Sequence, residues 1–136
     1  MFFIKLGLDN CIKAWDIRKG EIEEELYMHT DTITGLSLSH DGSYLLSNSM
    51  DQTVRCWDIR PFVVGSRCVK IFQGTSHGFD RNLLRVSWSK NGRLVSAGSS
   101  DKQVYIWDTT SRKILFKMGG HTGSVFLLKV LKFLGQ

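Results

Sequence analysis

A short motif that runs from an aspartate to a Trp-Asp pair occurs three times in the chain. Its copies are residues 9–16 (DNCIKAWD), 51–58 (DQTVRCWD) and 101–108 (DKQVYIWD). Each begins at an expected tight turn and places alternate residues, such as Val54 and Cys56, on one face of a strand. The tryptophans Trp15, Trp57 and Trp107 are 42 and 50 residues apart. A period of about 40–45 residues is typical of a four-stranded propeller blade.

Turn residues recur in step with the tryptophans. Asp41-Gly42 and Asn91-Gly92 are hairpin pairs that tolerate positive φ, and each glycine stands 15 residues before its tryptophan. A histidine precedes each cycle, at His29, His77 and His121. This combination resembles the WD40 repeat family. The resemblance implies a β-propeller fold and a binding module rather than an enzyme.

The length limits how much of a propeller the chain can build. Propellers typically use four to eight blades, and 136 residues are too few for a closed ring of such units. We therefore expect an all-β, partial propeller in the form of an open arc. Its expected parts are a partial blade at 1–28, complete blades at 29–74 and 75–118, and the start of a further blade with a divergent tail at 119–136. Both ends depart from the repeat, as in a truncated or alternatively spliced product.

The alternating patterns also predict individual strands. In the first complete blade they fall at residues 32–38, 44–49, 53–59 and 67–72, and in the second at 83–88, 94–98, 103–107 and 113–118. The partial blade before them should end a strand near residue 8 and continue with strands at 11–17 and 21–27.

The resemblance implies a buried polar network in each blade. His29, Ser47, Asp51 and Trp57 stand at the positions where the family links aspartate to histidine, and histidine through serine to the indole N–H. A serine, a histidine and an aspartate also form catalytic triads. A structural role is favoured, because a buried tryptophan needs an acceptor for its N–H and the histidine and aspartate recur in every blade. We predict that Trp57 is buried, with its N–H on Ser47 or His29.

The other two copies of this network are expected to be weaker. The third blade keeps His77, Asp101 and Trp107, but the position of the serine holds Ala97. The first blade keeps Asp9 and Trp15, and its equivalent of the serine is Lys5, which fits a buried network poorly. The network of the second blade should therefore be the best held.

Other functional chemistry is not indicated by the sequence. The four histidines do not approach metal-ligand spacing, and no glycine-rich phosphate loop occurs. We predict no catalytic residue, no metal and no cofactor. Cys11, Cys56 and Cys68 form no Cys-x-x-Cys pair, so they are expected to be free thiols in a reducing compartment. The N-terminus lacks the basic region of a signal peptide, and no apolar run is long enough for a membrane span.

Charge is distributed unevenly along the chain. Residues 1–54 carry a net charge of −5 and residues 55–136 a net charge of +10. Lysine and arginine on strand edges protect against edge pairing, which is one explanation. The alternative is a basic face that meets RNA or an acidic partner.

A candidate partner surface follows from the positions of the turns. Leu8, Met50 and Ser100 immediately precede the turn aspartates, so we expect them to line one rim of the arc. Phe79 and Arg81 should join them, because part of the longer 50-residue spacing falls near residues 78–82; the rest falls near residues 60–66. An exposed methionine suits a partner contact, and ordinary loop variation is the alternative.

Two stretches outside the repeat framework narrow the resemblance further. They are the Arg-Pro-Phe insertion at the end of residues 57–62 (WDIRPF) and the stretch 82–85 (NLLR), and both resemble the WD40 subunits of the spliceosomal U5 small nuclear ribonucleoprotein. The likeness covers about residues 7–125. It implies a nuclear, non-enzymatic scaffold in pre-mRNA splicing that contacts the large central U5 protein and other spliceosomal subunits, with RNA contact indirect and no membrane. The alternatives are a general WD40 adaptor of a ubiquitin ligase or chromatin complex, and a direct RNA binder.

Overall fold

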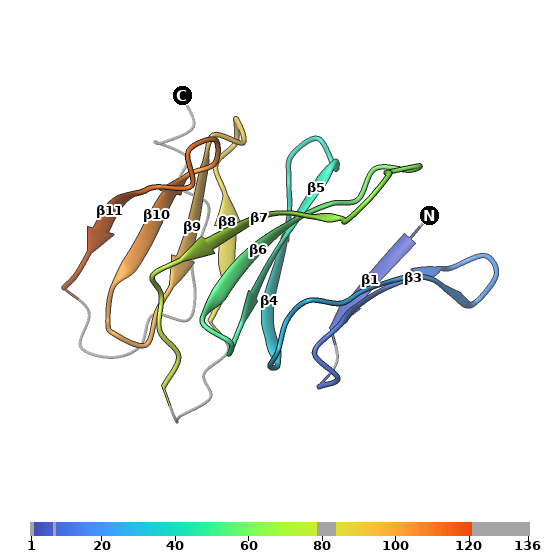
Figure 1. Cartoon of the computed structure of the whole chain (residues 1–136), viewed down its shortest axis with the longest axis horizontal. Helices are drawn as coiled ribbons and strands as arrows, with labels where there is room; N and C mark the ends of the chain where they lie inside the picture. The colour runs from blue at the N-terminus through green and yellow to red at the C-terminus, as the bar shows by residue number, and fades with distance from the viewer. Residues whose placement is uncertain (1, 7, 79–83, 121–136) are drawn as a thin grey trace.

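The computed structural model describes residues 2–6, 8–78 and 84–120, which form three antiparallel sheets (Figure 1). The first sheet contains β1 (Phe2–Leu6), β2 (Ile12–Asp16) and β3 (Glu21–Leu26). The second contains β4 (Ile33–Leu38), β5 (Tyr44–Ser49), β6 (Thr53–Asp58) and β7 (Cys68–Gln73). The third contains β8 (Val86–Trp88), β9 (Leu94–Gly98), β10 (Val104–Asp108) and β11 (Ile114–Met118).

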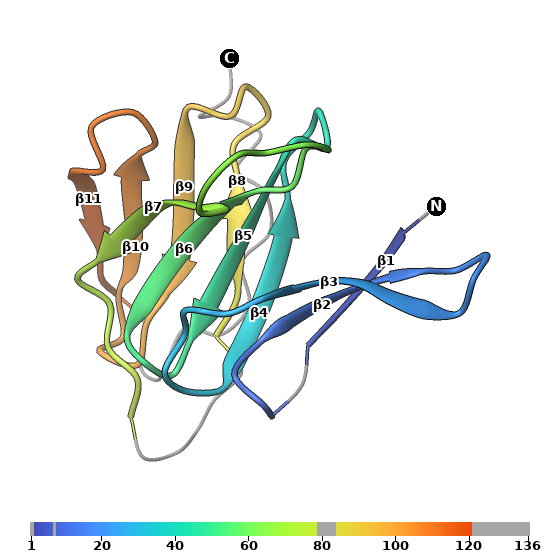
Figure 2. The same ribbon diagram turned by 45° about the vertical axis from the view of Figure 1, so that its right-hand side comes forward.

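The three sheets stand side by side as blades of an open arc, as Figures 1 and 2 both show. Within each four-stranded sheet the strands follow chain order. This arrangement confirms the predicted all-β partial propeller with two four-stranded blades. Residues 121–136, where we predicted most of a further blade, lie outside the described residues.

Strand positions agree closely with the sequence pattern, apart from the entry to the third blade. β5 and β9 have the predicted bounds. Of the strand predicted at 83–88, residue 83 lies outside the described residues, and the described part forms a strand only at Val86–Trp88. Just before this strand the chain contacts the neighbouring blade, where Thr34 Oγ1 donates to the Leu84 carbonyl at 2.8 Å. Asn48 Nδ2 donates to the same oxygen at 3.4 Å. This part of the chain therefore contacts the second blade before its own sheet begins.

The Asx-Gly hairpins form as their sequence predicts. The turn between β4 and β5 closes through Ser39 N to Tyr44 O at 2.8 Å and Gly42 N to Ser39 O at 3.0 Å. The turn between β8 and β9 repeats this geometry, with Gly92 N bonded to Ser89 O at 3.0 Å. Gly42 and Gly92 have φ of 75° and 72°, a region that side-chain-bearing residues seldom adopt.

The hydrophobic core lies between adjacent blades rather than within one of them. Trp57 packs toward the first sheet, in a cluster with Ile12, Leu26, Ile33 and Leu45. Trp107 packs toward the second sheet, in a larger cluster that also holds Leu46, Val54, Cys56, Phe72, Val86, Trp88, Val95, Ala97 and Tyr105. Each tryptophan thus faces the preceding blade, because alternate residues of a strand point to opposite sides of its sheet. Burial of these faces makes the blades depend on one another.

Close approach between the second and third blades requires a glycine at position 35. A Cβ atom built on Gly35 would lie 2.9 Å from the carbonyl oxygen of Leu84 and 3.1 Å from the Cα of Arg85. Both are backbone atoms, so no side chain could move to relieve the contact. β4 therefore contacts the next blade through its main chain.

All three cysteines are free, and Cys11 and Cys56 are buried. Burial raises the pKa of the Cys56 thiol to about 12. Within the described ranges no helix is long and apolar enough to cross a membrane. The same residues contain no cluster of three or more histidine, cysteine, aspartate or glutamate side chains that could hold a metal ion.

Candidate functional site

The second blade contains a continuous hydrogen-bonded network built from its connections and its central strands. The Nδ1 atom of His29 lies 2.7 Å from Asp51 Oδ2, and its Nε2 atom lies 2.6 Å from Ser47 Oγ. Trp57 Nε1 donates to the same Ser47 oxygen at 2.8 Å. The structure thus brings together the four residues that the sequence pointed to in this blade.

One tautomer of His29 satisfies every donor and acceptor of this network. Ser47 Oγ accepts from the indole of Trp57 and can donate its own proton to Nε2 of His29. With Nε2 as acceptor, Nδ1 carries the proton and donates it to the Asp51 carboxylate. Each polar atom then has a partner, which buried groups require.

Asp51 also orders the turn between β5 and β6. Its Oδ1 accepts from Thr53 N at 2.9 Å and from Thr53 Oγ1 at 2.6 Å, and its Oδ2 accepts from Thr30 N at 3.1 Å. Burial by itself raises the pKa of Asp51, but the hydrogen bonds from His29 and Thr53 outweigh it and hold that pKa well below its usual range. The carboxylate therefore joins a turn of the second blade to the segment that leads into it.

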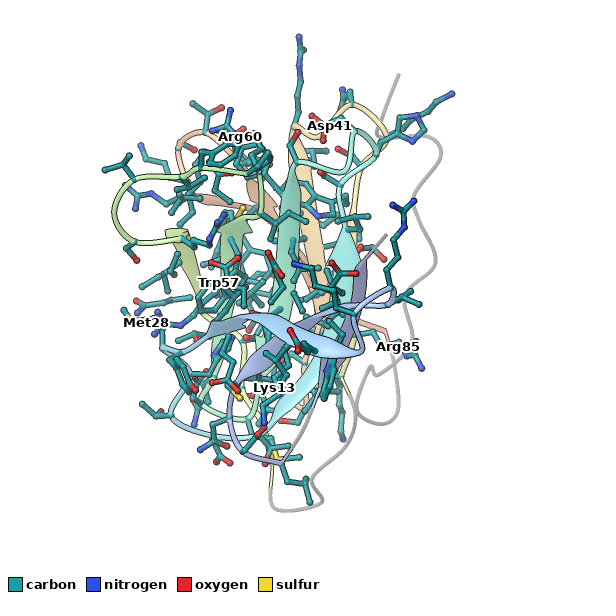
Figure 3. The ribbon with its side chains drawn as sticks, turned by 90° about the vertical axis from the view of Figure 1, so that its right-hand side faces the viewer. Lys13, Met28, Asp41, Trp57, Arg60 and Arg85 are labelled. Atoms are coloured by element: carbon teal, nitrogen blue, oxygen red, sulfur yellow. The ribbon has the colours of Figure 1, made fainter. Side chains whose placement is uncertain are left out.

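The burial of Ser47 argues against nucleophilic chemistry at this network. Ser47 is completely buried, and its oxygen already contacts both Trp57 and His29. A catalytic serine must reach a substrate carbonyl, and this hydroxyl lies inside the packed interface between two blades. Figure 3 shows the labelled Trp57 midway between the two ends of the strands, away from either edge.

In the third blade, the indole N–H of the buried Trp107 has a different acceptor. Its β9–β10 register places Ala97 opposite Tyr105, as Ser47 lies opposite Arg55 in the second blade. Without a hydroxyl there, Trp107 Nε1 donates to the carbonyl of Gln73 at 3.0 Å. This carbonyl belongs to β7, so the indole contacts the preceding blade.

The other two predicted residues of the third blade also have their own contacts. Asp101 accepts from the hydroxyl of Tyr105, and His77 Nε2 lies 3.3 Å from Asn48 Oδ1 of the second blade. Burial and then the hydrogen bond to Asp101 raise the pKa of Tyr105 to about 12. The sequence pattern held no signal for the contacts of Asn48 and Tyr105.

In the first blade, Asp9 and Trp15 are not joined by a hydrogen-bonded network among the described residues. The register places Lys5 opposite Lys13, at the position equivalent to Ser47. Asp9 pairs with Lys13 at 2.6 Å, and that hydrogen bond lowers the pKa of Asp9. Trp15 Nε1 is buried and has no hydrogen-bond partner in the described part of the chain.

The candidate partner rim lies along the lower edge of the arc in Figure 1. This lower edge carries the connections β1–β2, β5–β6 and β9–β10. Leu8 is 86% exposed there. Met50 is only half-buried rather than fully exposed, and Ser100 donates its hydroxyl to the Ser76 carbonyl at 2.8 Å. Phe79 and Arg81 lie outside the described residues.

The opposite, upper edge has hollows that the sequence did not indicate. A cleft of about 560 Å³ opens between the second and third blades, and its lining includes Tyr44, Val69, Lys70 and Trp88. A second cleft, of about 570 Å³, opens between the first and second blades and is bordered by Phe62. Part of the insertion near residues 60–66, which the sequence did indicate, borders the second cleft.

Comparison with known proteins decides the family. The model of the "WD domain, G-beta repeat" family matches residues 20–58 and 66–108. The chain belongs to the WD40 repeat family. It is 59% identical over 97 residues to the human "U5 small nuclear ribonucleoprotein 40 kDa protein", a match that covers 71% of this chain and 27% of that relative.

Two further relatives show how the likeness is distributed within the family. "Pre-mRNA-splicing factor cwf17" of Schizosaccharomyces pombe is 50% identical over 119 residues, which cover 88% of this chain and 35% of the relative. "WD repeat-containing protein 26 homolog" of Arabidopsis thaliana is 32% identical over 125 residues, covering 91% and 20%. The chain spans about a third or less of the length of these relatives.

Proposed function

We propose that this chain is a non-enzymatic protein-binding scaffold of the U5 small nuclear ribonucleoprotein, active in pre-mRNA splicing in the nucleus. The observation that supports this proposal is the excess of identity over the WD40 framework. A WD40 protein of another kind shares 32% identity with the chain, whereas the U5 subunit and the splicing factor share 59% and 50%. Membership of the WD40 family by itself accounts for an identity near the lower value, so the higher values favour a function shared with the splicing proteins.

The partners that follow from this proposal are spliceosomal proteins, foremost the large central protein of the U5 particle. A propeller fragment supports such contacts because its blades hold turns and connections on two edges, where exposed loops can differ without disturbing the core. The lower-edge residues Leu8, Met50 and Ser100 remain candidate contacts. We further propose that the blades of this scaffold end at residues 28, 74 and 118.

Co-purification separates this function from its alternatives. The tagged chain, expressed in cells, should recover U5 small nuclear RNA and U5 proteins from nuclear extract, and should recover no cullin. Recovery of a cullin or a chromatin complex without the U5 RNA would replace the proposal with a general adaptor function.

Direct RNA binding needs a separate measurement on the purified chain. A direct binder shows an affinity for isolated U5 RNA that falls steeply with salt concentration, because phosphate contacts release counterions. We expect the U5 RNA to be recovered through protein contacts, so that protease treatment of the captured particle releases it.

A further inference from the structure

The connection between β6 and β7 exposes apolar side chains at its tip. Phe62 is 96% exposed and Val64 is 98% exposed, the highest values among the large hydrophobic residues described. Both lie in the segment Pro61–Val64, within the longer of the two insertions that lengthen the repeat. Single apolar residues on a surface are ordinary, but a cluster that projects from an inserted loop indicates an interaction site.

The base of this connection is held firmly to the second blade. The Arg60 guanidinium contacts both carboxylate oxygens of Asp58, with Nη2 to Oδ2 at 2.6 Å and Nε to Oδ1 at 3.0 Å. It also lies 5.5 Å from the centre of the Tyr44 ring. Arg67 Nη1 donates to the carbonyl oxygens of Asp58 at 3.0 Å and Arg60 at 2.7 Å, and its Nε donates to Glu24 of the first blade. Figure 3 shows Arg60 at the upper edge of the molecule.

The backbone at the tip is strained. Phe62 has φ of 61°, in the left-handed region that is costly for a bulky side chain. Such a conformation persists only where the surroundings enforce it, and it tends to occur where a protein binds or acts. Here the residue with this conformation carries an aromatic ring that lies almost entirely in solvent.

The upper edge around this tip is basic. The four connections of the second and third blades on this edge, β4–β5, β6–β7, β8–β9 and β10–β11, carry six lysines and arginines against a single carboxylate, that of Asp41. Asp58 and Asp108 end the strands that enter two of these connections, and both accept hydrogen bonds there, from Arg60 and from Ser111 N. The exposed cations Lys90, Arg93, Arg112 and Lys113 have no ion pair among the described residues.

We propose that Phe62 and Val64 anchor a docking surface that inserts into an apolar pocket with an acidic border on a protein subunit of the U5 particle. This inference rests on the proposed function and names the surface that contacts the partner protein. A held loop loses little conformational entropy on binding, and buried aromatic anchors commonly dominate the affinity of an interface. A protein partner is favoured over RNA, because Phe62 is the single stacking plane at this tip, whereas its exposed neighbours Val64 and Pro61 are aliphatic and suit an apolar pocket.

The test measures binding of the full chain to purified U5 particles depleted of their own 40 kDa protein. Phe62→Asn removes the ring while keeping a residue that tolerates positive φ. We expect its Kd to rise by about tenfold or more, as for loss of a central aromatic anchor. Phe62→Tyr should bind like the wild type, and so should Phe116→Thr, which alters a half-exposed phenylalanine on β11. The melting temperature of Phe62→Asn should equal or exceed that of the wild type.

The outcomes of this test distinguish failure of the docking surface from failure of the proposed function. If the wild type binds and Phe62→Asn binds equally well, the docking surface is refuted and the proposed function stands. If the wild type does not bind, the proposed function fails and the docking surface fails with it. Phe62-dependent binding to isolated U5 RNA, without binding to U5 proteins, would overturn the choice of a protein partner.

Discussion

Replacement of Ser47 by alanine tests the polar network most directly. The substitution removes a single oxygen that accepts from Trp57 Nε1 at 2.8 Å and lies 2.6 Å from His29 Nε2. Ser47 is fully buried, and Trp57 and His29 are 1% and 7% exposed. Water therefore has little access to either nitrogen after the change. Both would be left without a partner inside the interface between the first two blades.

The expected loss of stability follows from these two groups. Each buried donor or acceptor without a partner costs about 1–3 kcal/mol, so the loss of both partners should lower the free energy of unfolding by about 2–6 kcal/mol. This is a large part of the roughly 5–15 kcal/mol that stabilises a typical domain. The Asp51 carboxylate would keep its bonds to Thr53 and Thr30, so the turn between β5 and β6 should persist.

Urea unfolding, followed by circular dichroism, measures this loss. We expect the midpoint to fall without a change in slope, because the surface exposed on unfolding stays the same. Ser37→Ala is the matched control, since Ser37 is a half-buried strand serine whose hydroxyl makes no hydrogen bond among the described residues. It should shift the free energy by no more than about 0.5 kcal/mol. Equal effects of the two substitutions would show that the network contributes nothing beyond packing.

Three further predictions concern single sites. Hydrogen bonds hold the pKa of Asp51 below its ordinary 3.8 despite burial, so its contribution to stability is present above about pH 4 and is lost as the pH falls further; Asp51→Asn should flatten that acid dependence in urea midpoints. Gly35→Ala should cost about 1–3 kcal/mol through backbone overlap with the third blade, whereas Gly119→Ala, with open space around its Cβ position, should not lower the melting temperature. Iodoacetamide at pH 8 should label half-buried Cys68 first and Cys56 only after denaturation. Mass spectrometry of the peptides measures the order of labelling, and the reverse order would contradict this prediction.

Local patterns sufficed to predict the architecture. The spacing of the Trp-Asp pairs, the Asx-Gly turns and the alternation of apolar residues depend on short stretches of chain, and β5 and β9 have the predicted bounds. The network of the second blade was also predictable, because its histidine, serine, aspartate and tryptophan each occupy a set place in the repeat. The sequence also predicted that Lys5 and Ala97 occupy the position of Ser47 in the other two blades. The strand register agrees, because each of the three residues lies opposite the residue two places before its blade's Trp-Asp tryptophan.

Contacts between blades could be decided only by the tertiary structure. Trp107 donates to the carbonyl of Gln73, and Thr34 donates to the carbonyl of Leu84 just before β8 begins. These partners are main-chain atoms, which every residue carries and no sequence pattern marks. The exposure of Phe62 is of the same kind, because the sequence located the insertion but the bonds of Arg60 and Arg67 set its direction. A repeat determines the form of one blade by local chemistry, whereas packing of whole blades determines what each presents to its neighbours and to solvent.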